Sequence, residues 1–262
     1  MENQLLDSDM LSNKEGKSLS SLLTNGYDTN AVDYIKKGFE IFKQNIGPFI
    51  GFIVLVAVME MIISMIPFLK GIVFALIAPI IAGGFIVAKM VDKKEVHSFN
   101  NFFDGTKNYM PLLIVTLIPT LITAALMLLL GGWAYFKMAF LGITPKINIS
   151  NFGDISAFSQ SMTGFAGRAG LVGIASIAIS VLFLFATFFV LFEKMEPIKA
   201  LDLSRKLISK KFFNWLGFLL LLGLFNAAGA LCLVVGLMVT IPSSICALYV
   251  AYEDVVGLNL RD

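Results

Sequence analysis

Three stretches, NIGPFIGFIVLVA (45–57), NYMPLLIVTLIPT (108–120) and KFFNWLGFLLLLG (211–223), join a short polar segment to a long apolar run in the same way. One crossing of a bilayer needs about 20 apolar residues. The blocks at 48–91 and 212–252 are long enough for two crossings each, and 110–130 and 169–192 for one. The sequence therefore predicts six spanning helices, at about 48–68, 71–91, 110–131, 168–192, 212–234 and 237–254.

The composition excludes a water-soluble globule. Of the 262 residues, 57% are hydrophobic and 15% are charged, and the mean hydropathy is +0.83. A soluble domain carries roughly 25% charged residues. We therefore expect an all-α polytopic membrane protein whose residues 31–262 form a single six-helix domain.

Residues 1–30 are polar and Ser-rich, without a basic segment followed by an apolar one, so we expect a flexible cytoplasmic tail rather than a secretory signal. The 20 Lys and Arg residues predict the orientation of the spans. Sixteen of them fall in residues 1–47, 88–109, 193–211 and the C-terminus, and four fall on the other side. By the positive-inside rule both termini are cytoplasmic, as an even number of spans also requires.

The chain also reads as a threefold repeat. Aligning Phe49, Leu112 and Trp215 divides it into units of about 31–95, 96–195 and 196–256, and Pro79 then pairs with Pro242. Each unit is a short helix, a span out and a span back, so the repeats are parallel, related by an axis along the membrane normal. Gene duplication would fix such a fold without any transport cycle, so the repeat alone does not identify a function.

We expect the short helix before each hairpin to be amphipathic and to lie in the membrane interface on the cytoplasmic side. In the first, Ile35, Phe39, Phe42 and Ile46 share one face. Ser98 is a helix cap for the second, and Pro197 suits the first position of the third. The alternative is a set of linkers that happen to be helical. Candidate contacts to anionic lipid headgroups are Lys36, Lys37, Lys43, Arg205, Lys206, Lys210 and Lys211.

The middle unit is interrupted by a predicted external loop, 131–168, and loops of this length are either functional or disordered. Glycines at steps of three follow from its end into the fourth span and favour a close helix crossing: Gly164, Gly167, Gly170 and Gly173.

One polar residue recurs in the first span of every unit. Glu60 and Asn226 each stand nine residues after a Gly-Phe pair, and Thr123 occupies the same offset in the middle unit. We expect the three near mid-depth, converging on one polar site. An ionisable group in a span usually faces a cavity or a partner. The site would bind a proton or cation, or it would only hold the helices together by hydrogen bonds.

Signatures of an enzyme are absent from the sequence. It has no H-E-x-x-H, no G-x-S-x-G and no Cys/His cluster, and His97 is its one histidine. Cys232 and Cys246 both fall in the last hairpin and define no disulfide framework. We therefore expect no catalysis, no metal and no cofactor.

Residues 196–254 resemble a large group of bacterial six-helix integral membrane proteins that includes the membrane domain of glycerophosphoryl diester phosphodiesterases. The similar features are an A-x-x-L-S-R-K elbow at 200–206, a Gly-rich turn at 229–236, a V-T-I-P step at 239–242 and a closing Y-E-D at 252–254. The resemblance implies a bacterial inner-membrane protein of this fold. It brings no activity, because catalysis in the phosphodiesterases belongs to a separate soluble barrel.

Two functions remain. The first is a small transporter or lipid-handling permease with a mid-membrane polar site. The alternative is a non-catalytic scaffold or accessory subunit that binds a partner protein, binds a second copy or organises lipid. The 16 cations on one side are what orientation requires, so we expect anionic lipid rather than nucleic acid as their partner.

Overall fold

The structure is a computed structural model that describes residues 22, 24, 26–66, 72–133, 136 and 155–257, with only the backbone described at 155–165, 233 and 234. All regular structure within these ranges is helical. Along the chain the helices are α3 (Ala31–Gln44), α4 (Ile46–Ser64), α5 (Val73–Asp92), η1 (Phe99–Asn108), α6 (Tyr109–Leu126), η2 (Met127–Gly131), α8 (Ile155–Leu182), α9 (Ala186–Phe192), α10 (Pro197–Ser209), α11 (Phe212–Leu231) and α12 (Leu233–Val255).

Six helices are long and apolar enough to cross a bilayer, as the sequence predicts. The first ends at Ser64 rather than near residue 68, before Pro67, and a residue that precedes proline is disfavoured in a helix. The fourth is interrupted at residues 183–185, between α8 and α9. The protein is therefore an all-helical, multi-pass membrane protein.

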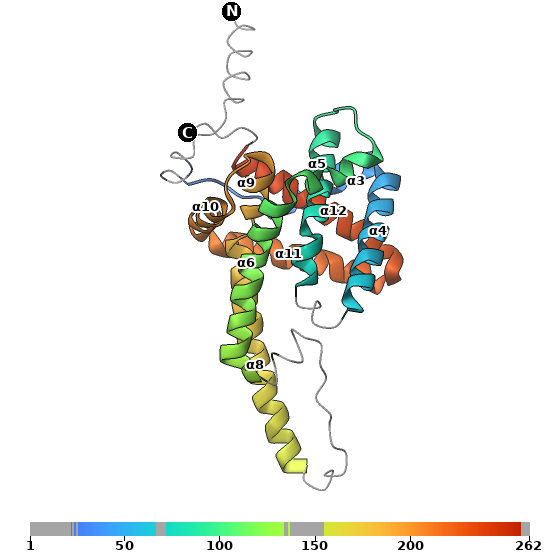
Figure 1. The fold of residues 1–262 in the computed structure, drawn as a ribbon. Coiled ribbons are helices and arrows are strands. Elements are labelled where there is room, and N and C mark those ends of the chain that lie inside the picture. Colours follow the sequence, from blue (N-terminus) through green and yellow to red (C-terminus); the bar gives the residue numbers. More distant parts are fainter. Residues whose placement is uncertain are drawn as a thin grey trace, which may run out of the picture.

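The spans form an outer and an inner layer. In the first span of each hairpin, which contains α4, α6 or α11, 17% to 22% of the most apolar stretch is buried. In the second span of each hairpin, the buried share is 39% to 61%. In Figure 1, α5 and α12 lie between α4 and α6. The first helix of every hairpin thus faces outward, and the second helix builds the core.

The three outer helices begin at positions that the repeat alignment makes equivalent: Ile46, Tyr109 and Phe212. The same positions of each are also buried. The third residue after each start is fully buried, at Phe49, Leu112 and Trp215. The sixth is buried as well, at Phe52, Val115 and Phe218.

Each short helix packs against the inner helix of a different hairpin. Helix α3 contacts α12, η1 contacts α5, and α10 contacts α9. Glycine permits the two closest approaches. A Cβ on Gly38 would overlap the backbone N of Ala247, and one on Gly83 would overlap the carbonyl O of Phe102. At the third contact, the Ser204 hydroxyl donates to the carbonyl O of Leu182 (2.9 Å), where α8 ends.

The face that α3 buries overlaps only in part with the predicted one. Phe42 is buried, and so are Tyr34, Gly38 and Ile41, whereas Phe39 and Ile46 are exposed. The reason is the contact with α12, which needs the small residue Gly38 at its centre. The apolar side chains on the neighbouring face remain on the surface.

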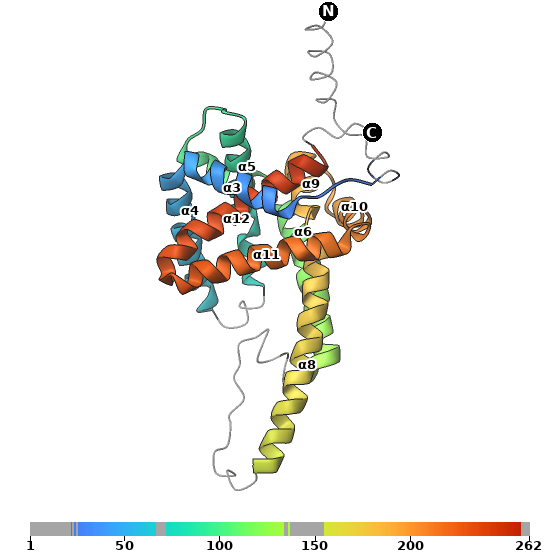
Figure 2. The same cartoon turned by 180° about the vertical axis from the view of Figure 1, so that it is seen from behind.

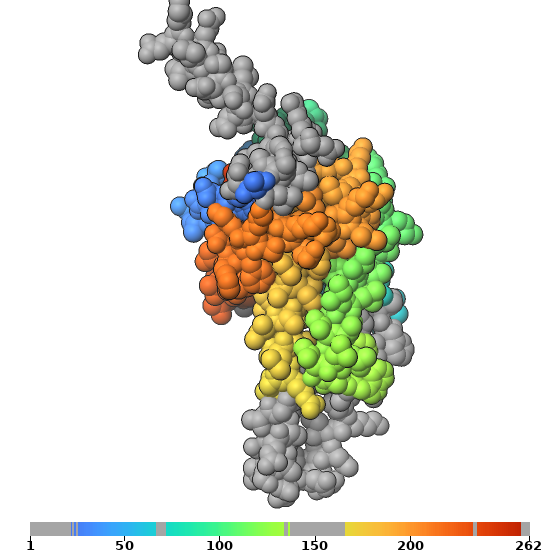
Figure 3. Space-filling model, turned by 90° about the vertical axis from the view of Figure 1, so that its left-hand side faces the viewer, coloured from blue at the N-terminus to red at the C-terminus, as the bar shows by residue number. Residues whose placement is uncertain are grey.

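Helices α6 and α8 run side by side and project beyond the other spans (Figures 1 and 2), and Figure 3 shows the two as adjoining lobes below the body. Helix α8 begins at Ile155, so the second part of the predicted loop 131–168 is helical. The close crossing expected at its glycines is wrong for Gly167, Gly170 and Gly173, since nothing lies within 4 Å of a Cβ built on them. Residues 137–154 lie outside the described residues.

The end of the predicted tail packs against the domain. Tyr27 is buried, and its ring lies beside that of Trp215 at a centroid distance of 6.2 Å. Asp28 forms an ion pair with Lys211 (3.2 Å). Residues 1–21 lie outside the described residues.

Candidate functional site

The three polar residues predicted to form one site all lie on outer helices. Glu60, Thr123 and Asn226 each come 14 residues after the first residue of their helix. At 1.5 Å per residue this is about 21 Å along the axis. Each of the three thus lies toward the C-terminal end of its own helix.

Asn226 is bonded within its own hairpin. Its side-chain NH₂ donates to the carbonyl O of Leu222 on α11 (2.9 Å) and to the hydroxyl of Ser244 on α12 (2.9 Å). Its Oδ1 is buried without a partner among the described residues, and so is the Oγ1 of Thr240, one turn from Ser244. Asn226 therefore links α11 to α12.

Thr123 is bonded to its own helix. Its hydroxyl donates to the carbonyl O of Pro119 (2.9 Å). A hydroxyl bonded four residues back uses its one proton within the helix and keeps only its acceptor lone pairs for other groups. Thr123 therefore makes its hydrogen bond within α6, without a second helix.

Glu60 differs from both. Its side chain is exposed, and within 26–66, 72–133 and 155–257 no hydrogen bond or ion pair reaches it. It lies four residues before the last residue of α4, about 6 Å from the helix end, rather than at mid-depth. A charged side chain at the centre of a bilayer costs on the order of 3 kcal/mol or more, so the position near the end lowers this cost.

No hydrogen bond joins any two of Glu60, Thr123 and Asn226 in the described part of the chain. The reason is the layering of the spans, because outer helices turn only one side to the core. The single central polar site predicted from the sequence is therefore not assembled by these contacts.

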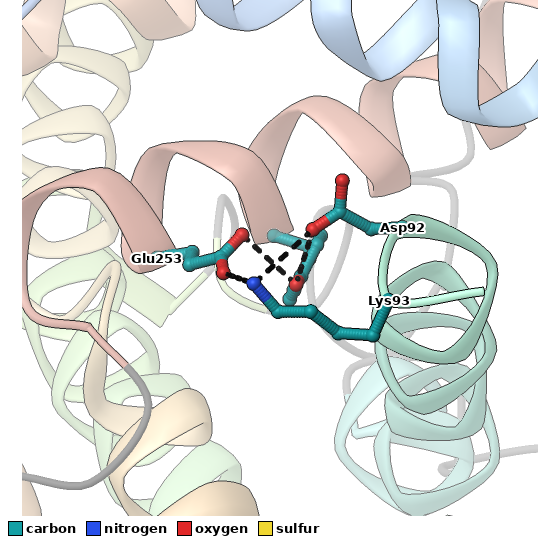
Figure 4. A network of polar contacts seen from close by, with 4 residues as sticks. Asp92, Lys93 and Glu253 are labelled. Carbon is teal, nitrogen blue, oxygen red and sulfur yellow. Dashed lines mark hydrogen bonds and ion pairs between the residues drawn. The ribbon is translucent and has the colours of Figure 1, made fainter. Parts of the chain in front are cut away.

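A second polar cluster, which sequence reasoning missed, lies where the inner helices end, close to α3 and α9. Lys93, just after α5, pairs with Glu253 of α12 and lies 3.6 Å from Asp92. The Tyr249 hydroxyl lies 3.0 Å from both carboxylates. Figure 4 shows Lys93 between Asp92 and Glu253. Partial burial lowers the pKa of Lys93, but the two carboxylates more than offset this and raise it.

Two further tyrosines bind acids in the same region. The Tyr34 hydroxyl of α3 donates to Asp254 (2.7 Å), and that of Tyr252 lies 3.4 Å from Glu193 at the end of α9. Burial and the nearby Asp254 raise the pKa of Tyr34 above its ordinary value of 10.0. The available sequence signal was that every inner helix ends in acidic residues: Asp92, Glu193, Glu253 and Asp254.

Aromatic rings fill the core between these acids and the outer helices. Trp215 is fully buried, and its indole N–H donates to Tyr27 (2.7 Å), whose hydroxyl donates to the carbonyl O of Leu207 (2.9 Å). Phe185 packs edge-on against both Trp215 and Tyr252. Buried aromatic rings in mutual contact therefore make up this part of the core.

Most of the candidate headgroup contacts have acidic partners nearby. Lys37 pairs with Asp33 (2.9 Å), Arg205 (2.8 Å) and Lys206 (2.5 Å) pair with Asp202, and Lys211 pairs with Asp28. Lys206 and Arg205 hold the pKa of Asp202 below its usual value, and Asp33 raises that of Lys37. Lys43 lies over the Phe39 ring, and Lys36 and Lys210 are exposed.

Within the described ranges, no three His, Cys, Asp or Glu side chains are grouped so as to hold a metal ion. Comparison of the chain with protein-family models, with curated proteins and with solved structures gave no match.

Proposed function

We propose that this protein is a non-catalytic membrane scaffold or accessory subunit that binds a partner protein within the bilayer. The observation that carries the proposal is the position of the polar residues. Thr123 and Asn226 are bonded inside their own hairpins, and Glu60 is turned to the outside. Nearer the starts of the outer helices, the core is filled by aromatic rings around Trp215.

The proposed architecture is three repeated hairpins, each preceded by an interfacial helix. The equivalent helix starts and the equivalent buried anchors, Phe49, Leu112 and Trp215, support it. The docking of each short helix on another hairpin also supports it, because it closes the units into a ring.

The proposed setting is a bacterial inner membrane with both termini in the cytoplasm. The excess of Lys and Arg on that side supports the orientation. The short helices would rest on anionic headgroups, with Lys36, Lys43 and Lys210 among the exposed cations. The resemblance of residues 196–254 to bacterial six-helix proteins agrees with this setting.

The competing function is a small transporter or lipid-handling permease. It would require a water-filled path through the inner layer. Cys246 reports on such a path, because it lies on α12 with its side chain fully buried.

The test is labelling of Cys246 in a Cys232→Ser variant with a small membrane-impermeant thiol reagent, from each side of the membrane. We expect no labelling in the native protein and full labelling after unfolding in SDS. Lys210→Cys, on the exposed surface, is the positive control. Labelling of native Cys246 would overturn the scaffold proposal in favour of transport.

A further inference from the structure

Glu60 belongs to an open seam along α4. Residues at alternating steps of four and three share one side of the helix: Ile46, Ile50, Ile53, Ala57, Glu60 and Ser64. Ile50 and Ile53 pack against the core, whereas Ala57, Glu60 and Ser64 are exposed. We call these last three residues the open seam.

The open seam has the composition of a helix-docking site. Ala57 and Ser64, on either side of Glu60, are small, and small residues let helix backbones approach closely in lipid. The Ser64 hydroxyl donates to the carbonyl O of Met61 (2.8 Å) and so has no further proton to donate. Glu60 is left as the one strong hydrogen-bonding group of the seam.

The facing helix explains why Glu60 has no partner inside the hairpin. When Pro79 is aligned with Pro242, the α5 residue equivalent to Ser244 is Ile81. Ser244 is the group that binds Asn226 in the last hairpin. Ile81 has a hydrocarbon side chain, so the position equivalent to Ser244 offers Glu60 no hydrogen bond.

We propose that the open seam of α4 binds a membrane-spanning helix of a partner protein that carries a lysine or arginine facing Glu60. This rests on the proposed scaffold function and names the chemistry of its partner. A carboxylate in lipid is best compensated by a cation that also donates a hydrogen bond. A polar residue in an otherwise apolar seam also fixes the register of the two helices.

The position of Glu60 sets the position of the partner's cation. Glu60 lies one turn from the end of α4 that is remote from α3. The partner's base therefore lies about one turn inside the same membrane boundary, where its long side chain still reaches the interface when the partner is alone.

The experiment uses the full chain, labelled with a fluorescence donor at the exposed Cys232, in phosphatidylcholine–phosphatidylglycerol vesicles. The probe is a designed helix of about 20 leucines and alanines that carries an acceptor and one lysine a turn from each end. Either insertion direction then brings a lysine to the depth of Glu60. The control helix has leucine at both positions.

We expect energy transfer to report association with the lysine helix about 10-fold tighter than with the leucine helix. Glu60→Gln should remove this preference, and Ala57→Leu should weaken binding of both helices by closing the seam. Thr123→Val, at the equivalent position of α6, should change neither. Unaltered thermal unfolding shows that each variant is folded.

Equal binding of the two helices, or a preference that survives Glu60→Gln, overturns the proposal. Lys70 is the basic residue that follows α4 in the sequence, and it lies outside the described residues. A preference that appears only after Lys70→Gln overturns the proposal too, because Glu60 is then paired within the chain. Energy transfer between copies without any peptide, abolished by Glu60→Gln, would replace the partner by a second copy. If any of these outcomes occurs while native Cys246 remains unlabelled by the thiol reagent, the scaffold function stands and only the proposed contact at Glu60 fails.

Discussion

The first and last hairpins place a polar residue at the same point and use it differently. In α11/α12, Asn226 binds Ser244 and ties the two helices together (2.9 Å). In α4/α5, Glu60 faces outward, and the equivalent of Ser244 is Ile81. The aligned position on the second helix thus carries a hydroxyl in the last hairpin and a hydrocarbon side chain in the first.

The largest effect is expected where α11 and α12 come closest. A Cβ on Gly236 would overlap the carbonyl O of Gly229, which is backbone and cannot move aside without shifting α11. Gly236→Ala should lower the free energy of unfolding by about 3 kcal/mol. Thermal and denaturant unfolding in detergent would measure it.

The matched control is Gly223→Ala on α11, where nothing lies within 4 Å of the added Cβ. This variant should be neutral or slightly stabilising, because alanine is the better helix former. Equal losses at both positions would mean that the last hairpin is not held by close approach.

The second prediction concerns Tyr34, which joins α3 of the first unit to Asp254 of α12. Its pKa is raised in the folded protein, so its contribution is complete below pH 10, the ordinary tyrosine value. It is lost as the pH rises toward the folded pKa, because the unfolded chain ionises first. At pH 11 the loss is about 1 kcal/mol.

Unfolding of the wild type and of Tyr34→Phe between pH 8 and 11 would measure this term. The wild type should lose stability over the range more steeply than the variant. Parallel curves would show that the Tyr34–Asp254 contact does not join the two units energetically.

The Asn226–Ser244 bond can be measured by a double-mutant cycle of Asn226→Leu and Ser244→Ala. A hydrogen bond between membrane helices contributes about 0.6 kcal/mol on average and up to about 1.7. We expect a coupling in this range because Asn226 reaches across to α12. Strict additivity of the two changes would place the stability of the hairpin elsewhere.

The reverse experiment moves the pair into the first hairpin. Glu60→Asn combined with Ile81→Ser should create a bond between α4 and α5 worth about 0.6 kcal/mol. Neither change alone should stabilise the protein. The double variant should also lose its preference for the lysine-bearing helix, which checks the comparison from both sides.

The smallest effect is expected for Glu60→Gln in the protein alone. The Glu60 side chain is exposed and has no bond to lose within the described residues, so stability should change by at most about 0.5 kcal/mol. Unfolding in detergent would measure it. A loss of 2 kcal/mol or more would mean that Glu60 is an internal anchor.

Much of the fold follows from local sequence. The long apolar runs gave six spanning helices, and the repeated junctions gave the starts of α4, α6 and α11. Both are local, because a bilayer requires every backbone group to bond within its own helix. The close crossing predicted from the regularly spaced glycines of α8 was wrong, since small residues permit a close crossing without requiring one.

The polar contacts between hairpins could not be predicted from the sequence. Lys93 pairs with Glu253, and Tyr34 donates a hydrogen bond to Asp254. In both cases the partner belongs to a different hairpin. Helix α4 is apolar on nearly every side, so its sequence does not indicate which side meets the core. The sequence by itself determined the class, the spans and the identity of one polar residue per outer helix. Only the tertiary structure decided which of these residues meets a partner, because that depends on the one side chain across the interface, distant along the chain.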